Sequence, residues 1–73
     1  MERIPVESSN LASIGYDPAA RLLEVEFKPT HTVYQYTDFP ENMWNEFIGA
    51  RSKGQYFASQ IKKQWQGRSV RVK

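Results

Sequence analysis

The sequence predicts a small α+β domain, with an antiparallel β-meander of three to four strands followed by two α-helices packed on one face. Three observations support this fold class. A chain of 73 residues suits a single domain with a modest core. Apolar residues recur with a period of two over residues 21–27 and with helical spacing over residues 43–48. Short connections between the predicted strands favour antiparallel pairing, and strands followed by helices are typical of α+β domains.

The predicted strands occupy the first half of the chain. Residues 3–6 are apolar enough for a short strand, which Pro5 restricts to a sheet edge. Residues 11–16 form the next expected strand. Residues 21–27 alternate apolar and acidic side chains, and residues 32–37 are rich in β-branched and aromatic residues. We therefore expect an antiparallel meander up to residue 37.

The first helix is expected to begin near Asp38, which could serve as its N-cap, with Pro40 in the first turn. Gly49 is expected to end or loosen it. The apolar face of this helix comprises four side chains: Met43, Trp44, Phe47 and Ile48.

The second helix is predicted to begin after Ser52, which forms a possible capping box with Gln55, and to extend to about Trp65. Residues 69–73 alternate weakly, which fits either a short strand or a frayed tail. The predicted core combines apolar side chains from the sheet and both helices: Leu23, Val25, Phe27, Phe47, Phe57 and Ile61.

Several classes of enzyme are excluded by composition. The chain has no cysteine and only His31 as an imidazole, so thiolate metal sites, disulfides and cysteine nucleophiles are ruled out. Glu24 and Glu26 share a strand face, which is better explained as a solvated surface than as an acid–base pair. The glycine spacing over residues 49–54 lacks the lysine of a phosphate-binding loop. We predict a non-catalytic protein with no cofactor and no metal.

Short apolar runs and the absence of a signal-peptide pattern predict a protein of the reducing cytoplasm, without a membrane-spanning segment. The charge is distributed unevenly. Residues 1–50 carry three basic and eight acidic residues, a formal charge of −5, whereas residues 51–73 carry seven basic residues and no acidic one. This basic end indicates binding to a polyanion such as nucleic acid. The alternative is a solvated tail that aids solubility.

Aromatic residues accompany these charges. Tyr34 and Tyr36 fall on one face of a predicted strand, and Tyr16 on a neighbouring strand could join them. These side chains could stack on RNA bases or fill the core. Tyr56 lies on the polar side of the second helix, where it could hold a base or pack sideways against the sheet or the first helix. The candidate nucleic-acid-binding residues are Tyr34, Tyr36, Arg51, Lys53, Tyr56, Lys62, Lys63, Arg68 and Arg71.

The chain resembles the KTSC domain over residues 6–65, nearly its whole length. The resemblance rests on a Tyr34-Gln-Tyr36 element combined with a downstream Ser52-Lys-Gly-Gln-Tyr-Phe57 element, and on Ser8-Ser9 and Ile14-Gly-Tyr-Asp17 upstream. The family is named for the C-terminus of some lysyl-tRNA synthetases and also occurs as small free-standing proteins of bacteria and phages. The resemblance implies a single KTSC-like domain and, by association, RNA or tRNA as a partner. The basic tail, residues 66–73, lies outside it.

The sequence therefore supports two functional hypotheses. The first is a binding module for RNA, with tRNA as one candidate, in which the basic helix and tail hold phosphates and tyrosines stack on bases. The second is a protein–protein interaction module without a nucleic-acid role, in which aromatic residues such as Trp44 or Tyr36 anchor a partner.

Overall fold

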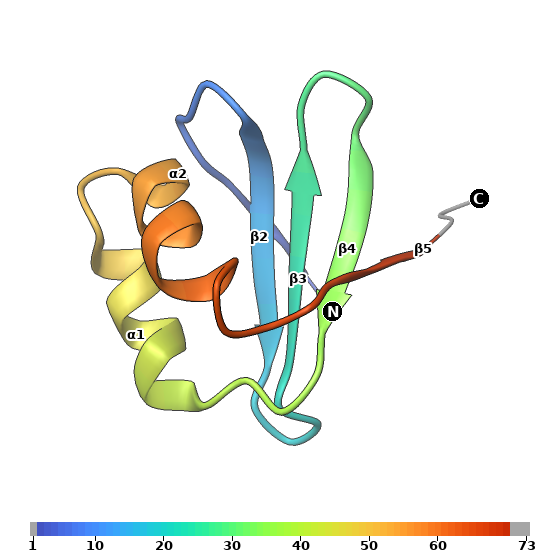
Figure 1. Ribbon diagram of the computed structural model, residues 1–73, viewed down its shortest axis with the longest axis vertical. Helices are drawn as coiled ribbons and strands as arrows, with labels where there is room; N and C mark the ends of the chain where they lie inside the picture. The colour runs from blue at the N-terminus through green and yellow to red at the C-terminus, as the bar shows by residue number, and fades with distance from the viewer. Residues whose placement is uncertain (1, 71–73) are drawn as a thin grey trace.

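The computed structural model, which describes residues 2–70, has two layers: a five-stranded antiparallel sheet and a helical layer on one of its faces (Figure 1). The strands follow one another in chain order across the sheet, β1-β2-β3-β4-β5. The elements in sequence order are β1 (Ile4–Pro5), β2 (Leu11–Asp17), β3 (Leu22–Phe27), β4 (Thr32–Tyr36), α1 (Glu41–Gly49), α2 (Lys53–Tyr56), the π-helical turn η1 (Phe57–Ile61) and β5 (Arg68–Val70). The predicted α+β class is confirmed, with one strand more than the upper estimate.

A bulge in β2 sets which of its side chains face the helices. Leu11 pairs with Phe27 and Ser13 pairs with Glu26, so Ala12 is left without a partner in the register. The extra residue brings Leu11 and Ile14, three positions apart, onto the same inner face, and both are fully buried. Strict alternation over this strand would have placed one of them on the outer face.

The core lies between the inner face of the sheet and the helical layer. Five of the six predicted core side chains are buried, whereas Phe27 is only partly buried at the edge of the cluster. The structure adds buried residues that the predicted core did not include: Leu11, Ile14, Val33, Tyr36 and Phe39. Val33 projects from the sheet face opposite to its neighbours Tyr34 and Thr32, and it pairs with Val70 of β5 in the register.

The start of α1 differs from the prediction. Its N-cap is Pro40, without a side-chain cap bond, and Asp38 instead adopts a left-handed backbone with φ of 58°. That conformation turns the chain from β4 so that Phe39 is fully buried. α1 ends at Gly49 as expected, and it buries Phe47, but Ile48 is 39% exposed because it lies beside the buried stripe.

The second helix is shorter than predicted. Ser52 caps it as expected, accepting a hydrogen bond from the Gln55 backbone N–H at 3.2 Å. The helix then widens into η1, closed by a bond from the Lys62 N–H to the Phe57 carbonyl at 2.9 Å, and the residues up to Trp65 leave the helix. Trp65 covers the core edge, with its ring 4.9 Å from that of Phe39.

Gly54 explains why the start of α2 lies close to the turn before β2. A Cβ atom at this position would come within 2.6 Å of Asn10 Oδ1 and 2.9 Å of Ser8 Oγ. The Ser8 hydroxyl in turn bonds to Asn10 Oδ1 at 2.9 Å. Ser8 upstream and Gly54 downstream thus lie close together, and glycine permits this close approach.

No helix within residues 2–70 combines the length and the apolar character that crossing a bilayer requires.

Candidate nucleic-acid interface

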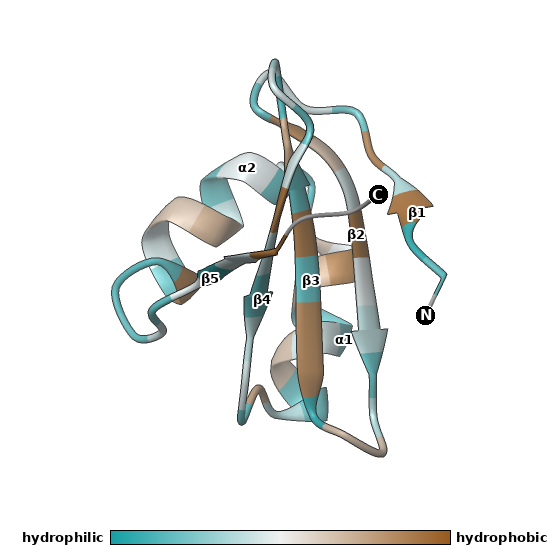
Figure 2. Ribbon diagram, turned by 90° about the vertical axis from the view of Figure 1, so that its right-hand side faces the viewer, coloured by the Kyte–Doolittle hydropathy of each residue, from teal (hydrophilic) through white to brown (hydrophobic). Residues whose placement is uncertain are grey.

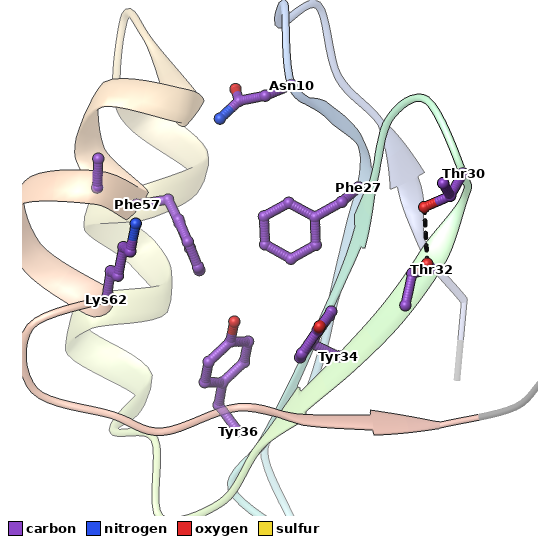
Figure 3. A pocket seen from close by; sticks show the side chains of 9 residues that line it. Asn10, Phe27, Thr30, Thr32, Tyr34, Tyr36, Phe57 and Lys62 are labelled. Atoms are coloured by element: carbon purple, nitrogen blue, oxygen red, sulfur yellow. Dashed lines mark hydrogen bonds between the residues drawn. The ribbon is translucent and has the colours of Figure 1, made fainter.

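A pocket with a volume of about 420 Å³ opens between the inner face of the sheet and the end of the helical layer (Figure 3). Its apolar walls come from both layers: Phe27 on β3 and Tyr34 on β4 face Phe57 of η1. Polar groups surround this aromatic lining and include an amide, hydroxyls and one ammonium group, from Asn10, Thr30, Thr32, Tyr36 and Lys62. An aromatic pocket with a few convergent polar groups is the usual form of a ligand site.

The aromatic walls hold one another at edge-to-face angles. The Phe27 ring lies 5.2 Å from the Phe57 ring at 73° and 5.4 Å from the Tyr34 ring at 86°. These separations fall in the favourable range for aromatic pairs. Tyr34 is partly buried, so part of its ring remains accessible. The pocket therefore has a preformed lining with one accessible tyrosine ring.

Tyr36 contributes its hydroxyl end rather than an open ring. It is 5% exposed, and its ring packs at 70° against Phe57, with centroids 5.8 Å apart. Burial raises the pKa of Tyr36 to about 12, so the phenol remains protonated at neutral pH. Of the two roles considered for this tyrosine, the structure shows the core-filling one.

Tyr56 points away from this pocket, toward α1. Its ring stacks on Phe47 at 5.4 Å and 20°, and its hydroxyl donates to Glu46 Oε1 at 2.8 Å. Partial burial, followed by the bond to the Glu46 carboxylate, raises the pKa of Tyr56 to about 12. One face of the ring is thus covered by the first helix. Trp44 of the same helix stacks on Tyr16 in a similar way, with ring centroids 5.5 Å apart and ring planes at 18°.

The basic residues within residues 51–70 do not gather on one surface. Lys62 lines the aromatic pocket, and Lys63 beside it is exposed. Arg51 and Lys53 line a separate groove next to β1. Arg71 lies outside the described residues.

Arg68 projects from the opposite face of the sheet. In the register of β4 with β5 it pairs with Gln35, whose amide donates to Glu24 Oε2 at 2.7 Å on the outer face. Directly paired residues in antiparallel strands project from the same face. Arg68 and Lys62 therefore cannot both contact one short ligand segment in the pocket.

The outer face of the sheet, turned toward the viewer in Figure 2, carries a polar network rather than the predicted solvated carboxylates. Arg3 Nη1 lies 2.9 Å from Glu24 Oε1, and the exposed fractions of these side chains are 26% and 14%. Glu26 accepts from the Ser13 hydroxyl at 2.6 Å and pairs with His31 Nδ1 at 2.7 Å. These hydrogen bonds, first that of Ser13, lower the pKa of Glu26. Both carboxylates are held as partners of structural bonds.

Sequence reasoning recognised Tyr34, Tyr36 and Lys62 but missed other lining residues of the pocket. Phe27 and Phe57 were assigned only to the core, although each also faces the pocket. Asn10 was not among the candidate binding residues, although it also lines the pocket. The alternation that placed Phe27 at the end of its strand could have indicated that it lies at the rim of the core. Among residues 2–70, no three side chains of histidine, aspartate or glutamate gather in a cluster suited to a metal ion.

Residues 7–65 match the KTSC domain. The chain belongs to the KTSC domain family. A crystal structure of a KTSC domain protein from Yersinia pestis shares 41% sequence identity, with a TM-score of 0.89 over 96% of this chain and 97% of that one.

Two further relatives of this KTSC domain come from bacteria. An uncharacterised protein of Stutzerimonas stutzeri is 38% identical over 64 residues, covering 88% of this chain and 89% of the relative. A protein of Tsukamurella paurometabola is 34% identical over 58 residues, covering 80% and 85% respectively. The resemblance inferred from sequence motifs is thereby confirmed, and with it the fold of the family.

Proposed function

We propose that this KTSC domain is a non-catalytic RNA-binding module that captures one unstacked nucleotide of a single strand in the aromatic pocket. The observation that carries the proposal is the combination of Phe27, Tyr34 and Phe57 with the ammonium group of Lys62 in one pocket of about 420 Å³. Aromatic surfaces stack on any base, while a neighbouring cation attracts the phosphate that follows it.

The polar rim suits the edges of a base and a ribose. Asn10 offers both a donor and an acceptor, and the hydroxyls of Thr30 and Thr32, 2.7 Å apart, can each do either. Single-stranded loops and ends of RNA present unstacked bases with exposed edges, whereas duplex RNA does not. Loops or the unpaired end of tRNA are therefore suitable partners, alongside unstructured RNA.

Phosphate contact in this proposal is limited to Lys62 and Lys63. Arg51, Lys53 and Arg68 lie on other surfaces, so they do not contribute to binding of a short segment in the pocket. Two phosphate contacts predict a slope of log K against log salt of about −1.4, at about −0.7 for each contact on a single strand.

The test is a fluorescence-anisotropy titration with labelled unstructured RNA and with labelled tRNA, at two salt concentrations. Tyr34→Ala should weaken binding by about 1–3 kcal/mol without changing the slope, since stacking releases no counterion. Tyr34→Phe, which keeps the ring, should bind nearly as well as the original chain. Lys62→Ala with Lys63→Ala removes both phosphate contacts, so it should flatten the slope by about 1.4 units, to near zero.

Arg68→Ala is the matched control, because it removes an exposed cation from the opposite face. It should leave the affinity for a short oligonucleotide unchanged. Absence of binding to both RNAs at low salt would refute the proposal and leave the protein-interaction hypothesis. An equal loss of affinity in Arg68→Ala and Lys62→Ala would show that binding is diffuse and not centred on the pocket.

A further inference from the structure

A second groove, with a volume of about 340 Å³, runs between β1 and the end of α1. Ile4 and Ile48, which are 49% and 39% exposed, both line it. They are the large apolar side chains that stand out as exposed within residues 2–70. Exposed apolar side chains that converge on one groove mark an interaction surface more often than isolated ones do.

Two cations border this apolar lining. Arg51 is exposed, and Lys53 is fixed in place by donating from its ammonium group to the Ala50 carbonyl at 2.7 Å. Glu7 also lines the groove and offsets part of their charge, leaving one net positive charge. The groove thus combines an aliphatic surface with a positively charged border.

We propose that this groove binds an acidic peptide segment of a partner protein, with one aliphatic side chain seated between Ile4 and Ile48 and carboxylates facing Arg51 and Lys53. This groove shares no lining residue with the aromatic pocket proposed to bind RNA. Charge complementarity selects an acidic partner, and the aliphatic lining selects an aliphatic anchor. No aromatic ring lines the groove, so it lacks the stacking surface that a nucleic-acid base requires.

The geometry of β1 favours docking through side chains over addition of a further strand. β1 has only two residues, and one of them is Pro5, which lacks a backbone N–H. An incoming strand would therefore find few donors on this edge. The aliphatic anchor and the carboxylates supply the contacts instead.

The test uses the full chain and a labelled synthetic peptide in which one leucine is flanked on both sides by glutamates. Anisotropy should show saturable binding that weakens as salt is raised. Replacing the leucine by serine should weaken binding about 3- to 10-fold, as expected for loss of a partly buried aliphatic side chain. Replacing the glutamates by glutamines should also weaken it and should remove most of the salt dependence.

Variants of the protein locate the site. Ile48→Ser should reduce affinity about 3- to 10-fold, and Ile4→Ser provides a second variant on the other wall. Arg51→Gln should reduce it about 2- to 5-fold, the range of an exposed ion pair. Glu7→Gln should increase the affinity, since this substitution removes a negative charge that repels the peptide carboxylates.

Two controls separate this site from the RNA pocket. Lys63→Gln removes an exposed cation elsewhere, and Tyr34→Ala alters the pocket; both should leave peptide affinity unchanged. Equal binding of the leucine and serine peptides, or equal loss in Lys63→Gln and Arg51→Gln, would overturn the proposal. Displacement of the peptide by an RNA oligonucleotide that itself requires Arg51 would also overturn it, because the groove would then be a phosphate site.

Discussion

Replacement of Gly67 by alanine tests how the segment between η1 and β5 closes over the sheet. A Cβ atom on Gly67 would lie 2.5 Å from Tyr36 Cζ, 2.6 Å from Cε2 and 2.7 Å from the hydroxyl oxygen. Carbon atoms in contact are separated by about 3.5–4.0 Å, so the ring or the backbone must move by about 1 Å. The Tyr36 ring is buried and held against Phe57, so it cannot yield freely.

The expected cost follows from overpacking. Inserting a methyl group into a packed site costs about 1–3 kcal/mol, and the reduced entropy of the unfolded chain returns about 0.4–1 kcal/mol. We therefore expect Gly67→Ala to lower the free energy of unfolding by about 1–2 kcal/mol. In a domain of this size, each kcal/mol shifts the melting temperature by about 4–8 °C. Urea unfolding monitored by tryptophan fluorescence measures the change.

Gly49→Ala is the matched control. No atom lies within 4 Å of a Cβ built on Gly49, which is the last residue of α1. This substitution should be neutral or stabilise the fold by up to about 1 kcal/mol, because alanine favours helix. In a protein that already carries Tyr36→Leu, Gly67→Ala should lower the free energy of unfolding by less than it does in the original chain, because the clashing ring is absent. If Gly67→Ala and Gly49→Ala had equal effects, the predicted contact between Gly67 and the Tyr36 ring would be wrong.

Three further predictions concern stability. Phe57→Ala should cost about 3–5 kcal/mol in urea melts, a large part of the roughly 4–11 kcal/mol expected for the domain, and a loss below about 1 kcal/mol would contradict its burial. The pKa of Glu26 is lower in the folded state, so the contribution of this carboxylate to stability is present above the usual value of 4.5 and is lost as pH falls through the folded-state pKa. Ser13→Ala should raise that pKa in an NMR titration and reduce the loss of stability in acid. An unchanged pKa would contradict the role of the hydroxyl. The pKa of Tyr56 is raised from 10.0 to about 12, so the contribution of this phenol to stability is present below pH 10 and is lost as pH rises from about 10 to about 12. Tyr56→Phe should reduce this loss of stability at alkaline pH in urea melts. An identical pH dependence in the two proteins would contradict this role of the phenol.

The order of the elements could be predicted from the sequence because each depends on local patterns. The alternation over residues 21–27 and the helical spacing around Phe47 reflect burial of one face, which is a local property of the chain. The Ser52 cap was also recognisable, since its bond spans only three residues. The motif resemblance added the family, which the comparisons confirm.

The features that the sequence did not reveal depend on contacts between distant segments. The bulge at Ala12 is fixed by pairing with β3, and the left-handed backbone at Asp38 by the need to bury Phe39. The π-helical turn shortened the second helix, although its residues have ordinary helix propensity. Such tertiary preferences override local ones.

The distribution of the candidate site residues was similarly hidden. The sequence grouped the cations because they lie near one another along the chain, yet the register of β5 places Arg68 on the outer face. For Tyr56 the sequence left two roles open, and the structure shows its ring packed against Phe47 of α1. Only the folded arrangement shows that Phe27, Tyr34 and Lys62 share one pocket.

The most direct test of the RNA proposal is a two-dimensional NMR titration of the full chain with a short unstructured RNA, following backbone and aromatic signals. Signals of the pocket residues should shift together and saturate with a single affinity: Phe27, Tyr34, Phe57 and Lys62. Signals from the outer face of the sheet, such as those of Arg68, should not move. Shifts that centre on the outer face, or that spread evenly over every exposed cation, would contradict RNA binding in the aromatic pocket.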